Sequence, residues 1–122
     1  MILVDTTVWV DHLRADDAQL SALLLSNQVL MHSFVIGELA CGNLRNRVEL
    51  LTLLTDLPQA PVASDAEVLF FIERHRLMGR GIGYIDAHLL AATALGDAGT
   101  SLWTRDQRLA ALAGELQLGI RV

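Results

Sequence analysis

Very short runs of apolar residues alternate along this chain with longer segments whose apolar residues recur at helical spacing. An apolar run of three or four residues is too short for a helix and is typical of a strand buried on both faces of a parallel sheet. Strands separated by helices require crossover connections, so the pattern predicts an α/β fold with a central parallel sheet. The predicted strands are residues 1–4, 29–31, 60–63, 101–103 and 119–122.

The predicted helices begin at residues that favour helix starts. Ser33 is expected to cap a helix over residues 34–40, and Ser64-Asp65-Ala66-Glu67 has the pattern of a capping box for a helix over 64–78. Gly79, Gly81 and Gly83 predict a flexible connector rather than a dinucleotide-binding loop, since no clear strand precedes them. The other predicted helices are residues 8–13, 20–25, 47–57, 85–95 and 106–113.

Length and composition predict one domain, residues 1–122, with an aliphatic core. The chain is 52% hydrophobic, 19% charged and only 5% aromatic, a composition that excludes a disordered segment. It has neither the pattern of a secretory signal nor an apolar run of the roughly 18 residues that a membrane span needs, so the cytosol is the expected compartment and no membrane partner is expected. The single Cys41 excludes an internal disulfide framework and a cysteine-built zinc site.

All nine basic residues are arginines, and the chain has no lysine. A phosphate-binding P-loop and a receiver domain both need a lysine, as does Schiff-base chemistry. A phosphatase of the haloacid-dehalogenase type needs a lysine and an acid two positions after Asp5, where this chain has Thr7. These classes are excluded.

Four acidic residues lie near the ends of predicted elements. Asp5 directly follows the first strand, Asp106 comes three residues after Trp103, Asp86 lies at the start of the helix over 85–95, and Glu38 lies inside a short apolar helix. Ligands of open parallel sheets bind at the carboxyl ends of the strands, so these acids are candidates for one site. In the alternative interpretation, Asp5, Asp86 and Asp106 are ordinary helix caps or first-turn acids, and Glu38 is a solvated side chain.

If the four carboxylates converge, a divalent cation is the simplest way to keep them ionised. A site of carboxylate oxygens without cysteine suits a hard cation such as Mg²⁺ or Mn²⁺. Such ions can activate water and neutralise a scissile phosphate, which indicates hydrolysis of a phosphodiester.

Four segments along the chain form a recognisable set: Val4-Asp5-Thr6-Thr7-Val8-Trp9, Gly37-Glu38-Leu39, Tyr84-Ile85-Asp86-Ala87-His88-Leu89 and Leu102-Trp103-Thr104-Arg105-Asp106. In this order they resemble the PIN-domain nucleases and, among them, the VapC toxins of prokaryotic toxin–antitoxin pairs. No segment is specific alone, but the four together are, and the resemblance covers the chain from Met1 to Val122.

The resemblance implies an α/β/α sandwich and a Mg²⁺- or Mn²⁺-dependent endoribonuclease that leaves a 5′-phosphate and a 3′-hydroxyl. It assigns Asp5, Glu38, Asp86 and Asp106 to the acidic quartet that binds metal and supports catalysis, with Glu38 as the candidate to orient water. Thr6 would be a supporting polar group beside the site. Thr104 and Asp106 remain alternatives for the dominant role at the fourth position.

A net charge of −5 is unusual for a protein that binds RNA. Without the four candidate acids, 10 of the 14 acidic residues remain against 9 arginines, so the rest of the chain is close to neutral. Arg80 and Arg105 are the candidates to contact RNA phosphates, whereas Arg74 and Arg76 are expected on a solvated helix face. Weak non-specific affinity favours recognition of a structured RNA such as tRNA by its shape.

The resemblance also implies partners: a homodimer, and a VapB-type antitoxin that blocks the acidic pocket and through which alone the complex reaches operator DNA. A rival hypothesis is a PIN-like binding subunit that acts mainly as a transcriptional regulator in the DNA-bound complex. The intact set of four acids favours catalysis.

Overall fold

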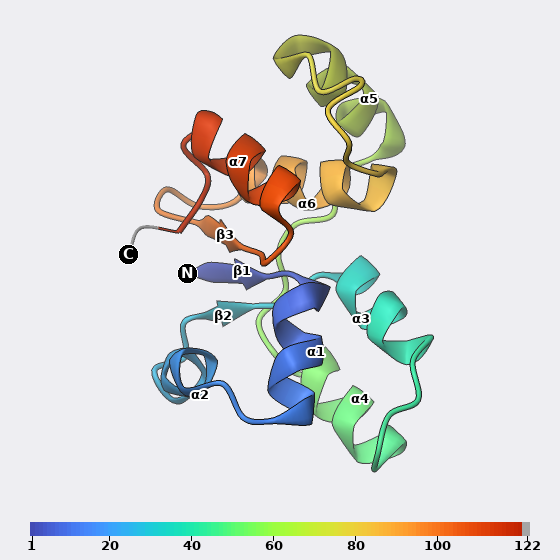
Figure 1. Ribbon diagram of the computed structural model, residues 1–122, viewed down its shortest axis with the longest axis vertical. Coiled ribbons are helices and arrows are strands. Elements are labelled where there is room, and N and C mark those ends of the chain that lie inside the picture. Colours follow the sequence, from blue (N-terminus) through green and yellow to red (C-terminus); the bar gives the residue numbers. More distant parts are fainter. Residues whose placement is uncertain (121–122) are drawn as a thin grey trace.

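The computed structural model describes residues 1–120 and is built around a three-stranded parallel sheet (Figure 1). The strands are β1 (Ile2–Val4), β2 (Val29–Leu30) and β3 (Ser101–Trp103), in the order β2-β1-β3. Val4 is in register with Trp103, and Leu3 with both Leu30 and Leu102. The first strand of the chain is therefore the central one, and its carboxyl end lies beside that of β3.

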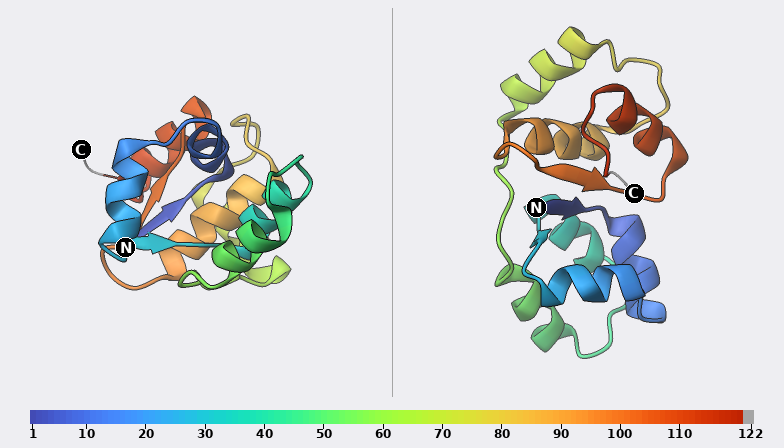
Figure 2. Two further views of the ribbon diagram at one scale, coloured as in Figure 1. Left: turned by 90° about the horizontal axis from the view of Figure 1, so that it is seen from below. Right: turned by 90° about the vertical axis from the view of Figure 1, so that its left-hand side faces the viewer.

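Seven helices connect and cover the strands within the described residues. They are α1 (Thr6–Arg14), α2 (Ala18–Leu25), α3 (Ser33–Ala40), α4 (Arg47–Thr55), α5 (Asp65–His75), α6 (Tyr84–Leu95) and α7 (Gln107–Glu115). Figure 2 shows the strands enclosed between helices, and α6 and α7 both pack against β3. This arrangement confirms the predicted α/β/α sandwich.

The core is aliphatic, as the composition predicts. The inner residues of β1 and β3 are buried, and α6 is buried over the whole stretch from Ala87 to Thr93. Leu3, Leu89 and Leu90 have no exposed surface. Burial of each such side chain contributes roughly 1.5–3 kcal/mol, which holds the helices and strands that carry the candidate acids in place.

Two predicted strands are not formed as expected. In place of a strand over 60–63, the structure has a single bridge between Met31 and Gln59, and Pro61 lacks the N–H that a longer ladder would need. In place of a strand over 119–122, Gly119 forms a single bridge with Leu102. The rest of that prediction, residues 121 and 122, lies outside the described residues.

Several predicted helix ends are also corrected. The N-cap of α3 is His32, whose Nδ1 accepts the Phe34 N–H at 3.0 Å, so Ser33 is the first helical residue and not the cap. The predicted capping box at Ser64 is confirmed, but α5 ends at His75 instead of residue 78, because Arg76 takes a left-handed conformation.

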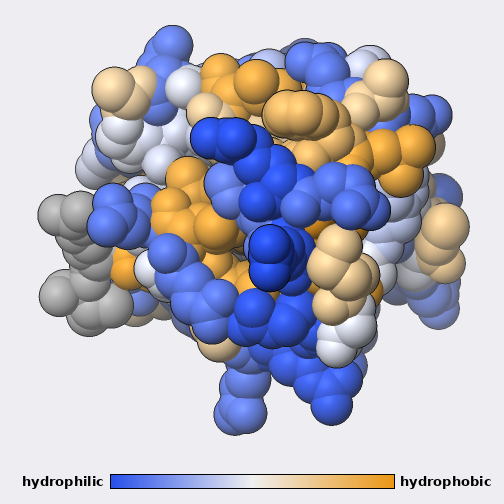
Figure 3. Space-filling model, turned by 90° about the horizontal axis from the view of Figure 1, so that it is seen from above, coloured by the Kyte–Doolittle hydropathy of each residue, from blue (hydrophilic) through white to orange (hydrophobic). Residues whose placement is uncertain are grey.

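Apolar side chains also reach the surface. On α5 Leu69 and Phe70 are 58% and 67% exposed. From above, apolar patches are interrupted by hydrophilic side chains (Figure 3). Within residues 1–120, none of the helices combines the length and the hydropathy needed to cross a membrane.

Candidate active site

The four candidate acids line one pocket of about 460 Å³ at the carboxyl edge of the sheet. Asp5 follows β1, Glu38 lies on α3, Asp86 lies in the first turn of α6, and Asp106 is the N-cap of α7. Four elements, separate in sequence, thus each bring one carboxylate to the same pocket. The pocket's lining residues are Asp5, Thr6, Thr7, Val10, Asp11, Glu38, Asp86, Arg105 and Asp106.

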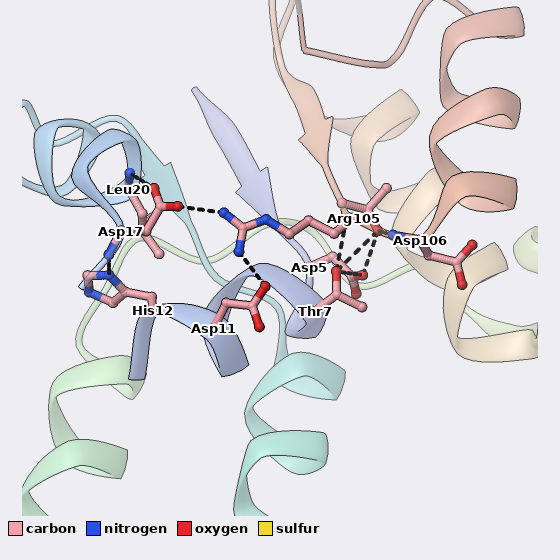
Figure 4. Close-up of polar contacts among 9 residues, drawn as sticks. Asp5, Thr7, Asp11, His12, Asp17, Leu20, Arg105 and Asp106 are labelled. Carbon is pink, nitrogen blue, oxygen red and sulfur yellow. Dashed lines mark hydrogen bonds and ion pairs between the residues drawn. The ribbon is translucent and has the colours of Figure 1, made fainter. Parts of the chain in front are cut away.

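Asp5 is the buried member of this set, with 4% of its surface exposed. Its position is the N-cap of α1, but its side chain makes no capping hydrogen bond to that helix. Instead its Oδ2 accepts the hydroxyls of Thr7 at 2.9 Å and Thr104 at 2.7 Å (Figure 4). The ordinary alternative of a capping aspartate is therefore wrong for the Asp5 side chain, which these two hydroxyls hold at the pocket.

Glu38 is exposed and is held by the neighbouring strand-to-helix turn. Its Oε1 accepts the Thr6 hydroxyl at 2.8 Å, across 32 positions of sequence. Thr6 therefore lies where the motif places a supporting polar group, and its direct partner is Glu38.

Asp86 shows that the four carboxylates affect one another. Its partial burial raises the pKa of its carboxyl above the ordinary value, and the nearby charges of Asp5, Asp106 and Glu38 raise it further. A hydrogen bond from the Gly83 N–H, at 3.4 Å, opposes this effect on the pKa. The pocket consequently favours a bound positive charge.

Thr104 and Asp106, the alternatives at the fourth position, have different contacts. The Thr104 hydroxyl donates to Asp5 and accepts the Asp106 N–H at 3.1 Å. Asp106 caps α7 by accepting the Leu109 N–H at 3.0 Å, and its carboxylate points away from Asp5 in Figure 4. Asp106 therefore fills the capping role of the ordinary alternative while it also lines the pocket.

Two polar residues that line the pocket are not anticipated from the sequence, Thr7 and Asp11. They lie four positions apart on α1, so one helix face presents both side chains to the site. Once Asp5 is known to precede a helix, the spacing of four positions between Thr7 and Asp11 indicates that Asp11 is a fifth acid at the pocket.

The two candidate phosphate contacts are both paired with acids. Arg80, on the connector before α6, forms an ion pair of 2.8 Å with Glu115 of α7 and is not among the pocket's lining residues. Arg105 lines the pocket, but its guanidinium pairs with Asp11 and Asp17.

The donor set fits a hard divalent cation in its chemistry, since every candidate ligand is a carboxylate oxygen. Among the described residues, no three His, Cys, Asp or Glu side chains stand close enough together to hold a metal ion as they are placed. Binding would therefore need carboxylates of the pocket to move closer together.

A parallel-stranded α/β/α sandwich with acids from four elements at its carboxyl edge is the arrangement that the sequence motifs lead one to expect. A comparison with known families matches residues 2–115 to the PIN domain, and the chain belongs to the PIN-domain family. Within that family it is similar to the VapC proteins. It is 50% identical over 115 residues to Ribonuclease VapC32 of Mycobacterium tuberculosis, from strains CDC 1551 / Oshkosh and ATCC 25618 / H37Rv. The aligned region covers 94% of this chain and 92% of that relative, which confirms the resemblance drawn from the four motifs.

Proposed function

We propose that this protein is a toxin endoribonuclease that depends on Mg²⁺ or Mn²⁺. The observation that carries the proposal is the convergence of Asp5, Glu38, Asp86 and Asp106 on one pocket at the edge where parallel sheets bind ligands. The similarity to a protein named as a ribonuclease supports RNA as the substrate. We expect the protein to act in the cytosol.

Asp5, Glu38, Asp86 and Asp106 would hold the cation, which supplies activation of water and neutralisation of the scissile phosphate. The chain's own contribution is preorganisation. Thr7 and Thr104 keep Asp5 turned to the pocket through the two hydrogen bonds that its Oδ2 accepts. Thr6 orients Glu38, the candidate to position the attacking water.

Structured RNA such as tRNA is the proposed substrate class. The pocket is lined by five carboxylates and one guanidinium that is itself paired, so its surface gives little general attraction for a polyanion. Recognition of an unpaired loop by shape is the mode consistent with that charge.

Two partners belong to the same proposal. A hollow of about 530 Å³ adjoins the acidic pocket and shares Val10 and Glu38 with it, and its lining includes Leu13, Leu39 and Leu50. An antitoxin peptide lying in this hollow could extend a basic side chain among the acids and inhibit the enzyme. The exposed Leu69 and Phe70 of α5 support a second copy of this chain as a further partner.

The test is cleavage of total tRNA by the purified protein with Mg²⁺, with Mn²⁺ and with EDTA, beside Asp5→Asn. Asp56→Asn is the matched control, because it makes the same chemical change at an exposed helix end away from the pocket. Discrete fragments that require both metal and Asp5 are expected. Equal cleavage by Asp5→Asn would reject the site, and no cleavage of any RNA by folded protein would favour the binding-subunit hypothesis.

A further inference from the structure

Arg105 joins three segments of the chain beside the acidic pocket (Figure 4). It lies on the loop between β3 and α7, and its two terminal nitrogens bind different carboxylates, Oδ2 of Asp11 on α1 and Oδ2 of Asp17 between α1 and α2. Its side chain is 36% exposed and that of Asp17 is 20% exposed.

The main chain of Arg105 is held as well. Its N–H donates to the Thr7 hydroxyl at 3.0 Å, and that hydroxyl donates to Asp5. On the N-terminal side of Arg105, Thr104 also donates to Asp5. The loop that carries Thr104 and Asp106 is therefore connected to Asp5 through the hydroxyls of Thr7 and Thr104. The Arg105 guanidinium connects the same loop to Asp11 of α1 and to Asp17 at the start of α2.

The acids that bind Arg105 are fixed in turn. Asp17 is the N-cap of α2, where its Oδ1 accepts the Leu20 N–H at 2.9 Å, and its own N–H donates to Nδ1 of His12 at 2.9 Å. The hydrogen bond from the Leu20 N–H lowers the pKa of Asp17 most, and the hydrogen bond from Arg105 lowers it further. Because Leu20 is fully buried, Arg105 is anchored to the core through Asp17.

We propose that Arg105, Asp11 and Asp17 form a clamp that positions the β3–α7 loop of the active site. In this role Arg105 is a positioning residue: its two nitrogens are bound to acids of its own chain, so it acts on the reaction through Thr104, Asp106 and Asp5. This replaces the sequence prediction that Arg105 contacts an RNA phosphate. The proposal rests on the proposed nuclease function for its kinetic consequences but not for its structural ones.

The first test measures the loop itself, by NMR hydrogen exchange of the Arg105 and Asp106 amides, which donate to Thr7 and Thr104. The variant is the double change Asp11→Asn with Asp17→Asn, since asparagine keeps the helix cap at 17 while it removes both charges that bind Arg105. Protection of these two amides should fall by roughly 10-fold or more, with the β1 amides unchanged. Asp16→Asn removes the exposed neighbouring charge and is the control that should change neither.

The second test separates kcat from KM on a cleaved RNA. The clamp predicts that Asp11→Asn with Asp17→Asn lowers kcat by about 10- to 100-fold without raising KM, and that adding Arg105→Ala lowers it no further. A phosphate ligand at Arg105 predicts the opposite: Asp17→Asn alone, whose carboxylate does not line the pocket, keeps its kcat, and Arg105→Ala raises KM. Unchanged amide exchange would overturn the clamp even if no RNA substrate is found, whereas loss of the nuclease function alone leaves the exchange result standing.

Discussion

A single side chain in the pocket can lower the stability of the fold while it supports activity, and Asp86 is the clearest case. Burial and three neighbouring carboxylates raise the pKa of its carboxyl in the folded protein. A group whose folded pKa is raised stabilises the fold below its unfolded pKa, and that contribution is lost as pH rises through the folded pKa. At neutral pH the ionised Asp86 therefore lowers the free energy of unfolding.

Asp86→Asn should consequently raise the free energy of unfolding of the metal-free protein at pH 7 while it lowers nuclease activity by about 100-fold. Urea unfolding in EDTA and cleavage assays measure the two effects. Asp56→Asn, which leaves the pocket intact, should change neither. A less stable Asp86→Asn protein would show that Asp86 does not experience the repulsion inferred here.

His32 is a second residue whose ionisation matters. It is fully buried, and this burial, followed by the nearby His88, lowers the pKa of His32 from 6.5 to about 4. Between these values the unfolded chain binds more protons than the folded one, so stability must rise with pH over this range. As pH falls from 7 to 4, the lowered pKa of His32 should decrease the free energy of unfolding by up to about 3 kcal/mol.

His32→Asn tests this effect, because asparagine still offers an acceptor at the N-cap of α3 but does not titrate. The free energy of unfolding of the variant should depend less on pH between 4 and 6.5 than that of the wild type. Equal pH dependence in the two proteins would mean that folding does not lower the pKa of His32.

At the scale of elements, the glycine connector before α6 holds two glycines, Gly79 and Gly81, in the left-handed region, and Gly81 is the more crowded of the two. Gly81 has φ of +84°, and a Cβ there would lie 2.7 Å from the Arg108 side chain, whereas at Gly83 φ is −94° and a Cβ would meet nothing within 4 Å. Gly81→Ala should therefore destabilise the protein by about 1 kcal/mol or more, and Gly83→Ala should be nearly neutral. Thermal unfolding of the pair measures this contrast, and similar losses for both would contradict the conformational argument.

The elements that follow apolar periodicity were predictable, and those that depend on distant partners were not. The three strands and the seven helices follow local patterns, such as the Ser64 capping box. Whether residues 59–63 or 119–120 continue the sheet depends on which strand edge they meet and, for residues 59–63, on Pro61.

In the candidate site, too, the residues that follow local patterns were predictable and the contacts between distant positions were not. Asp5 and Asp106 could be placed at the carboxyl edge because they follow strands, and Glu38 and Asp86 were candidates from their positions on predicted helices; the motifs assigned all four to one site. The pairing of Arg105 with Asp11 and Asp17 joins positions 94 and 88 residues apart, so nothing local indicates it.

At the scale of the whole molecule, a cation among the four carboxylates should stabilise the fold, because only the folded chain brings them together. At 100 times its dissociation constant, a ligand adds about 2.7 kcal/mol to the free energy of unfolding. Mg²⁺ or Mn²⁺ should therefore raise the Tm of the wild type by several degrees and that of Asp86→Asn by much less. Differential scanning fluorimetry with metal titration measures this difference, and an equal rise in both proteins would indicate binding elsewhere.

The strand order has a consequence for the time at which the pocket comes into existence. Of the three strands of the sheet, the central strand β1 is the first to be synthesised and β3 is the last. The hydrogen bond from Thr104 to Asp5 spans 99 positions. A nascent chain that stops before Ser101 already has Asp5, Glu38 and Asp86, yet it lacks Asp106 and the hydroxyl that holds Asp5. A chain that stops before Ser101 therefore cannot complete the pocket, and we expect such truncated chains to lack nuclease activity.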